Sequence, residues 1–191
     1  MKKLLGILVL GLFLITPSQA DDIKDFQIEG ISIGDSALEF FDKKEIEERK
    51  KIGFVYTDKT FFSATFYNKD FFEKYHNVQL HIKANDSKYI IYSVAGRINY
   101  EDNYNECVNE MEKILPELEA LFPEARFIDD DTEIWTNIKG YKVKTKSYYL
   151  LLSDGGNIAL ECYDQPKEMN VIDNLSIAID SNEFVEFLTT D

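Results

Sequence analysis

Acidic side chains at alternate positions of one short segment have the chemistry to bind a hard divalent cation. Asp129, Asp131 and Glu133 are each two residues apart, which is the spacing of the first three ligands in a calcium-binding EF-hand loop. The pattern then departs from that loop, because Ile134 stands where its glycine belongs and Gly140 where its last glutamate belongs. A solvated acidic loop is the favoured interpretation, with a calcium-dependent binding module as the alternative.

Aromatic residues crowd the segment 53–75, where nine of 23 residues are Phe or Tyr. Phe62 and Phe66 share one face of a predicted strand and are expected in the core. Three rings are candidates for the opposite face: Tyr56, Phe61 and Tyr67. Exposed together, they would mark a surface for a ligand or partner, although core packing of these rings is the favoured interpretation.

The two cysteines are expected to face a common core. Cys107 lies on the apolar stripe of a predicted helix, and Cys162 alternates with Ile158 and Leu160 on one side of a predicted strand. In an oxidising compartment this placement predicts a disulfide that closes 55 residues. The alternative is two free, buried thiols. Neither cysteine has a histidine that the pattern pairs with it, so a catalytic thiol is not expected.

The two histidines give no metal or base pattern. His81 alternates with apolar residues and is expected to point outward, and His76 falls in a predicted loop. Two histidines five residues apart do not share a face of a helix or strand, so surface positions are the favoured interpretation and no metal or cofactor is predicted.

The strands that position these residues follow from alternating apolar residues bounded by turn residues. They are expected at 31–33, 54–57, 60–67, 78–83, 88–100, 141–152, 157–163 and 175–179. Helices are expected after Ser36, after Asp42 and after Asp180, with a long amphipathic helix over 103–122 that Pro116 kinks or breaks. The segment 124–140 is poorly periodic and is expected to be a loop.

Most of these strands come as hairpins rather than as strand-helix-strand units. The predicted fold is therefore α+β, with an antiparallel sheet, the long amphipathic helix and shorter terminal helices packed on it. No internal repeat and no linker rich in Pro, Gly or Ser divides the chain, so residues 21–191 are expected to form a single domain.

Charge and the first residues predict where the chain acts. The 21 Lys and Arg against 35 Asp and Glu give a net charge of −14, which repels nucleic acid. Residues 1–20 have the form of a signal peptide: Lys2 and Lys3, an apolar run, and small residues at Ser18 and Ala20. The apolar run is too short for a transmembrane helix. A periplasmic or secreted protein, free of the membrane after cleavage, is expected.

Gly34-Asp35-Ser36, between a predicted strand and a predicted helix, resembles the opening of the GDSL/SGNH hydrolases over about eight residues. That resemblance implies a nucleophilic role for Ser36. Those enzymes also need a histidine base near the C-terminus, and this chain has none after His81. Helix capping by Ser36 is the favoured interpretation.

Two further resemblances point to export and binding. The segment 25–36, together with Ala95-Gly96-Arg97-Ile98 and Leu121-Phe122-Pro123, resembles a family of small, exported, uncharacterised bacterial proteins. The stretch from Ile33 to Phe40 is similar to the opening of SmpA/OmlA and β-lactamase-inhibitor-like modules. The resulting expectation is a non-catalytic binding protein for an envelope protein or a small ligand. The alternatives are a serine hydrolase that uses Ser36 and a calcium-dependent module.

Overall fold

The computed structural model describes Ile23, Tyr56 and residues 26–54, 58–101, 103–137 and 139–190. The predicted signal peptide lies outside the described residues, as do residues 55 and 57 of the predicted strand 54–57. Within the described ranges, no helix combines the length and the apolar character needed to cross a bilayer.

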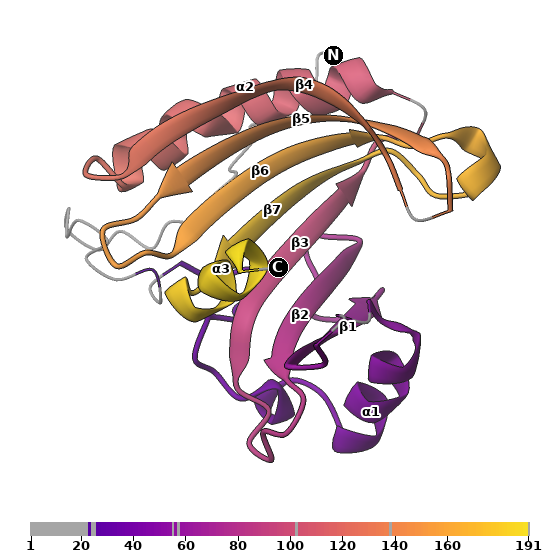
Figure 1. Ribbon diagram of the computed structural model, residues 1–191, viewed down its shortest axis with the longest axis vertical. Helices are drawn as coiled ribbons and strands as arrows, with labels where there is room; N and C mark the ends of the chain where they lie inside the picture. Colours follow the sequence, from indigo (N-terminus) through magenta and orange to yellow (C-terminus); the bar gives the residue numbers. More distant parts are fainter. Residues whose placement is uncertain are drawn as a thin grey trace, which may run out of the picture.

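Seven antiparallel strands form one curved sheet in the order β1-β2-β3-β7-β6-β5-β4 (Figure 1). In chain order they are β1 (Phe61–Tyr67), β2 (Asn77–Lys83), β3 (Ile91–Asn99), β4 (Arg126–Thr136), β5 (Lys142–Leu151), β6 (Asn157–Asp164) and β7 (Asn174–Asp180). β7 lies between β3 and β6 and so joins the early hairpins to the late ones. The α+β class and the antiparallel sheet are confirmed.

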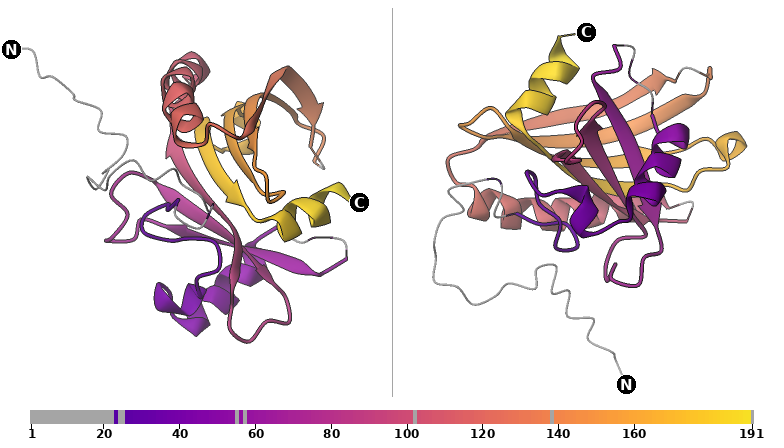
Figure 2. Two further views of the ribbon diagram at one scale, coloured as in Figure 1. Left: turned by 90° about the vertical axis from the view of Figure 1, so that its left-hand side faces the viewer. Right: turned by 90° about the horizontal axis from the view of Figure 1, so that it is seen from below.

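The helices lie on both faces of this sheet. They are α1 (Lys43–Ile52), α2 (Tyr104–Leu121) and α3 (Asn182–Thr189), with two short 3₁₀ helices, η2 (Ala37–Glu39) and η3 (Lys167–Met169). α2 packs on β6 and β7, and α3 lies on the opposite face (Figure 2). Alternation along β6 explains this, because Ile158 and Leu160 face α2 while Glu161 faces the other way.

One face of the sheet carries the main hydrophobic core. Over β6 and β7, α2 buries Cys107, Met111, Ile114 and Leu118, at the spacing of three or four residues that defines one side of a helix. Over β1 to β3, the segment before α1 covers the same face with Ile28, Ile31 and Phe41, and Phe41 stacks on Phe66 with ring centroids 3.5 Å apart. The core position predicted for Phe62 and Phe66 is confirmed.

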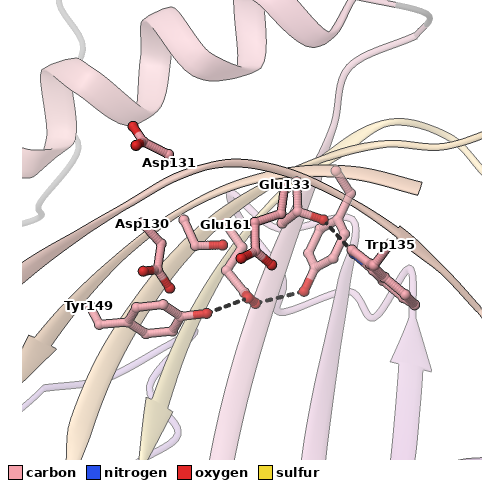
Figure 3. A pocket seen from close by; sticks show the side chains of 9 residues that line it. Asp130, Asp131, Glu133, Trp135, Tyr149 and Glu161 are labelled. Carbon is pink, nitrogen blue, oxygen red and sulfur yellow. Dashed lines mark hydrogen bonds between the residues drawn. The ribbon is translucent and has the colours of Figure 1, made fainter. Parts of the chain in front are cut away.

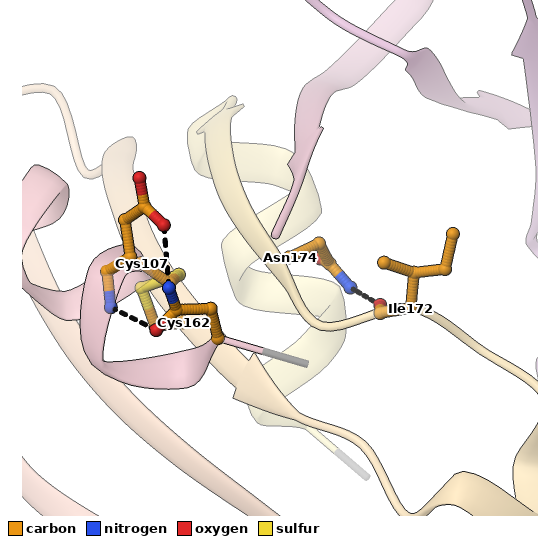
Figure 4. Close-up of a disulfide and its surroundings, with 6 residues drawn as sticks. Cys107, Cys162, Ile172 and Asn174 are labelled. Atoms are coloured by element: carbon orange, nitrogen blue, oxygen red, sulfur yellow. Dashed lines mark hydrogen bonds between the residues drawn. A yellow bond between two sulfur atoms is a disulfide. The ribbon is translucent and has the colours of Figure 1, made fainter. Parts of the chain in front are cut away.

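A disulfide fastens α2 to the sheet, as the two cysteine patterns predicted (Figure 4). Cys107 and Cys162 are fully buried, and their Cα atoms are 5.9 Å apart. This separation suits a disulfide without backbone movement. Because it closes 55 residues, the bond removes much of the conformational freedom of the unfolded chain.

The helices differ from the sequence prediction at two boundaries and at one interior position. Ser36 acts as a helix cap, as predicted, through a capping box with Glu39, but the helix that follows is only the 3₁₀ turn η2. The helix after Asp42 forms as α1, but the Asp42 side chain makes no capping hydrogen bond. The last helix is capped by Ser181, whose hydroxyl accepts the Phe184 N–H at 3.3 Å, and not by Asp180. α2 continues through Pro116 without a break, because this residue is on the exposed side and water can satisfy the carbonyl left without a donor.

The largest error in the prediction concerns 124–140, which contains strand β4 and not only a loop. Nearly all residues of β4 are exposed, so no alternation of buried and exposed side chains marks it as a strand. β4 is an edge strand held by its pairing with β5. In the predicted strand 54–57, the described Phe54 and Tyr56 are not in a strand.

Candidate functional site

A cleft of about 180 Å³ opens over β4, β5 and β6, on the sheet face opposite α2 (Figure 3). Its lining is made of carboxylates, hydroxyls and aromatic rings: Asp130, Asp131, Glu133, Trp135, Thr145, Ser147, Tyr149, Glu161 and Tyr163. These nine residues include four carboxylates and no Lys or Arg. The cleft therefore has a strongly negative lining.

Strand register brings these side chains together from three strands. One cross-strand row contains Asp130, Ser147 and Glu161, and the next contains Glu133, Thr145 and Tyr163. Asp130 and Glu133 are three residues apart, and in a regular strand they would face opposite ways. The register of β4 shifts between them, so both pair with residues on the cleft side of β5. This β-bulge is what makes the two carboxylates converge.

Glu161 is fixed at the centre of the cleft by two tyrosines. The Tyr149 hydroxyl donates to Oε1 at 3.2 Å and the Tyr163 hydroxyl donates to Oε2 at 2.7 Å. Burial, with the Glu161 charge second, raises the pKa of Tyr149 to about 12 and the pKa of Tyr163 well above its usual value. Both hydroxyls therefore stay protonated and keep donating to this carboxylate at physiological pH.

Trp135 stands at the β4 side of the cleft. Its Nε1 donates to Thr145 Oγ1 at 2.9 Å, which fixes the indole, and 43% of the residue's surface is exposed. An immobilised, partly exposed indole offers a π face to a bound group.

Positive charges near the cleft are already engaged with other groups. Lys146 lies on the α2 side of β5, where it pairs with Asp129. Arg97 lies in the same cross-strand row as Glu161, with Ser176 of β7 between them. Its guanidinium donates to Gln79 Oε1 at 2.7 Å and to Asn77 Oδ1 at 3.4 Å. In the described residues, Glu161 makes no ion pair within 4.0 Å.

The structure separates the three carboxylates that were the calcium candidate. Asp129 is paired with Lys146 on the α2 side of the sheet, whereas Asp131 and Glu133 belong to the lining of the cleft, where Asp131 points away from the other labelled side chains in Figure 3. Within the described ranges, no group of three or more His, Cys, Asp or Glu side chains is arranged to hold a metal ion. The EF-hand-like spacing fails because it lies on an extended, bulged strand.

The three aromatic residues considered as a binding face do not form one surface. Phe61 is buried, with its ring 4.8 Å from that of Phe187, and Tyr56 contacts the same ring at 4.9 Å. Tyr67, at the other end of β1, is 51% exposed. α3 covers the first two rings, and the sequence pattern gave no sign of that contact.

Ser36 has a structural position. Its hydroxyl donates to the Lys88 carbonyl at 2.6 Å and accepts the Leu38 N–H at 3.3 Å. Both interactions are with the backbone, and they hold η2 against the segment before β3. The capping role is confirmed.

His76 also contacts the backbone, since its Nδ1 accepts the Asn99 N–H at 3.3 Å.

A second polar cluster, which sequence reasoning missed, lies under α3. His81 lies on the side of β2 away from the core, as predicted, but it is half-buried there because Phe184 of α3 stacks on the imidazole with centroids 4.6 Å apart. Register places His81, Ser93 and Asp180 side by side on β2, β3 and β7. His81 Nδ1 is 3.1 Å from Ser93 Oγ, and Asp180 hydrogen-bonds to the same serine.

These three residue types also occur in hydrolases, but the arrangement differs in two ways. Ser93 stands between the acid and the imidazole, so Asp180 does not orient His81 as a catalytic acid would. Ser93 is only 1% exposed, which leaves no access for a substrate. We interpret the cluster as a buried polar contact between the sheet and α3.

Burial shifts both titratable members of this cluster. It lowers the pKa of His81 to about 3, with a smaller contribution from the Arg97 charge. It raises the pKa of Asp180 to about 6, and the Glu161 charge adds to this while the Ser93 hydrogen bond opposes it. At neutral pH the cluster therefore holds a neutral imidazole and a carboxylate that burial destabilises.

Asp180→Asn is expected to raise the melting temperature at pH 8 and to leave it almost unchanged at pH 4. The folded-state pKa of Asp180 is above its unfolded value, so its contribution to stability is complete below pH 3.8 and is lost as pH rises through about 6. Asparagine keeps an oxygen acceptor for Ser93 without the charge. Circular dichroism melts at both pH values test this, with exposed Asp70→Asn as control. A lower melting temperature at pH 8 would show that the buried charge is stabilising.

Comparison of the chain with protein-family models, with curated proteins and with solved structures gives no match to any of them. The functional argument for this chain therefore rests on the cleft itself.

Proposed function

We propose that the chain is an exported, non-catalytic binding protein whose cleft accepts a cationic group, such as the side chain of a lysine or arginine. The observation that carries this proposal is Glu161, a carboxylate held by two tyrosine hydroxyls inside a cleft that has no Lys or Arg in its lining. Export is part of the proposal and rests on the character of residues 1–20.

Electrostatics favours a cation over other ligands. Hydrogen bonds between ionised partners are shorter and about twice as strong as neutral ones, and two tyrosine donors leave Glu161 with further acceptor positions. The aromatic faces of Trp135 and Tyr149 add cation–π attraction of about 0.5–1 kcal/mol each at a partly exposed site. The net charge of −14 also attracts cations toward the molecule from a distance.

Size favours a small group. The cleft volume is about 180 Å³. Pockets for drug-sized ligands are larger, about 300–1,000 Å³. A cationic side chain matches this volume better than a large metabolite. The partner expected from the sequence, an envelope protein or a small ligand, is thereby narrowed to one that presents such a cation.

Titration calorimetry with N-acetyl-arginine amide and N-acetyl-lysine amide tests the proposal. The wild-type protein is expected to bind at least one of them, and Glu161→Gln is expected to weaken binding at least tenfold, or about 1.4 kcal/mol. Glutamine keeps the shape of the side chain and an acceptor for the tyrosines but removes the charge. The matched control is Glu119→Gln, which removes one charge from the exposed side of α2 and should bind as wild type does.

Two results would contradict the proposal. The first is that neither amide binds the wild-type protein. The second is that the amides bind Glu161→Gln as tightly as they bind the wild-type protein. Binding that Glu119→Gln weakens equally would show that only the net charge matters and that the cleft is not the site.

A further inference from the structure

β4 leaves one side of its backbone without a partner in the part of the chain that the structure describes. It is the last strand of the sheet and pairs only with β5, over 11 residues from Arg126 to Thr136. The opposite edge of the sheet is different, because Gly53 and Phe54 lie against β1. There the Phe54 N–H donates to Ser63 Oγ at 2.6 Å. An open strand of this length is a template for a further strand.

The backbone groups that face outward can be assigned from the hydrogen-bond alternation. The Asn137 N–H donates to the Tyr141 carbonyl at 2.9 Å, so this pair is a hydrogen-bonded one. In an antiparallel ladder, hydrogen-bonded pairs alternate with non-hydrogen-bonded pairs. From the register, the backbones of Trp135 and Glu133 therefore also hydrogen-bond to β5. Ile134 and Thr136, which lie between them, turn their N–H and C=O groups to the open side.

The open edge and the cleft adjoin each other. Glu133 and Trp135 line the cleft with their side chains, and Ile134, between them, presents its backbone to the open side. A residue paired beside Glu133 would have its Cβ about 5 Å away on the same face. Its side chain would therefore begin at the mouth of the cleft.

Charge decides which kind of strand fits. β4 contains Asp129, Asp130, Asp131 and Glu133 against one basic residue, Arg126. A second copy of β4 would place acidic residues beside acidic residues, which is destabilising in a sheet. A strand that carries Lys or Arg on the cleft face would pair with opposite charges instead.

We propose that an extended basic segment of another protein adds to the outer edge of β4 and inserts a Lys or Arg side chain into the cleft. The proposal rests on the proposed function, because the cleft supplies the cation specificity and the β4 backbone supplies the added affinity. The other face of the added strand lies beside Ile134, whose surface is 68% exposed. The recognised pattern is therefore alternating basic and apolar residues.

A short synthetic peptide that alternates lysine and valine, with both ends blocked, tests this by calorimetry beside N-acetyl-lysine amide. The peptide is expected to bind wild type at least tenfold more tightly than the amide. Two further peptides carry N-methyl groups on every second backbone nitrogen, one on the odd positions and the other on the even positions. One of these two peptides should bind no more tightly than the amide, because it keeps the lysines but loses the N–H groups that donate to β4. Ile134→Pro should reduce peptide binding to the level of the amide and leave amide binding unchanged, since the N–H that it removes points outward and makes no bond to β5.

Ile134→Ala is the matched control, because it keeps the N–H and should lose less than the proline variant. The methylated peptides need no protein variant, so the test stands if Ile134→Pro does not fold. Equal binding of the methylated and unmethylated peptides overturns strand addition, and so does a peptide that binds no better than the amide. If neither amide nor peptide binds, the proposed function fails as well. A dimer in sedimentation that Ile134→Pro dissociates, without peptide binding, would assign the edge to a second copy.

Discussion

Replacement of both Cys107 and Cys162 by alanine is expected to lower the free energy of unfolding by about 4 kcal/mol. The disulfide closes 55 residues, and its loss lets the unfolded chain explore all the conformations that this loop excluded. The effect is large against the 5–15 kcal/mol that stabilises a typical domain. Both sulfurs are fully buried between α2 and β6, so their removal also loses packing.

Urea unfolding followed by circular dichroism measures this change. Wild type unfolded in the presence of a thiol reductant is the control, because it lacks the bond but keeps the sulfur atoms. The free energy of unfolding of the reduced wild type should fall by most of the expected loss of about 4 kcal/mol. In the double alanine variant it should fall by slightly more. A loss below about 1 kcal/mol in both would mean that packing alone holds α2 on the sheet.

Phe184→Ala is expected to cost about 3–5 kcal/mol, the range for a large aromatic residue removed from a core. Phe184 is 2% exposed, stacks on His81, and has its ring centroid 5.2 Å from that of Phe61. Because α3 has only eight residues, the helix depends on such contacts and not on its own propensity.

The matched control for Phe184→Ala is Leu188→Ala on the same helix, because Leu188 is 49% exposed. We expect the control to change stability by less than about 0.5 kcal/mol. A second observable is the pKa of His81, followed by NMR. Burial holds this pKa near 3 in the wild type, and it should rise toward its usual value when the phenyl ring is removed. Equal effects of the two substitutions, or an unchanged pKa of His81, would contradict the role assigned to α3.

The sequence predicts the strands that bury one face, and it fails where burial gives no pattern. β2 and β6 alternate because one side of each faces the core, and along β6 the alternation correctly placed Ile158 and Leu160 on the same side as Cys162. β4 was missed because nearly all of its side chains are exposed. The covering of His81 by α3 was missed because it is a tertiary contact between segments about 100 residues apart.

The cleft lay beyond sequence reasoning for a related reason. Asp130, Ser147 and Glu161 are far apart along the chain and meet only through strand register. The bulge that turns Asp130 and Glu133 to the same side has no marker in the sequence, and without it the alternating carboxylates suggested a cation loop instead. The sequence therefore showed that β4 is acidic, but it did not show the strand geometry that brings its carboxylates together in the cleft.

The most direct test of the cation-binding cleft uses Trp135, the single tryptophan of the chain, which lines it. As N-acetyl-arginine amide or N-acetyl-lysine amide is added, we expect the indole emission of wild type to change and to saturate for the one that binds, while Glu161→Gln shows no saturable change. Emission that stays constant in wild type with both, or that changes equally in Glu161→Gln, would contradict cation binding at this site.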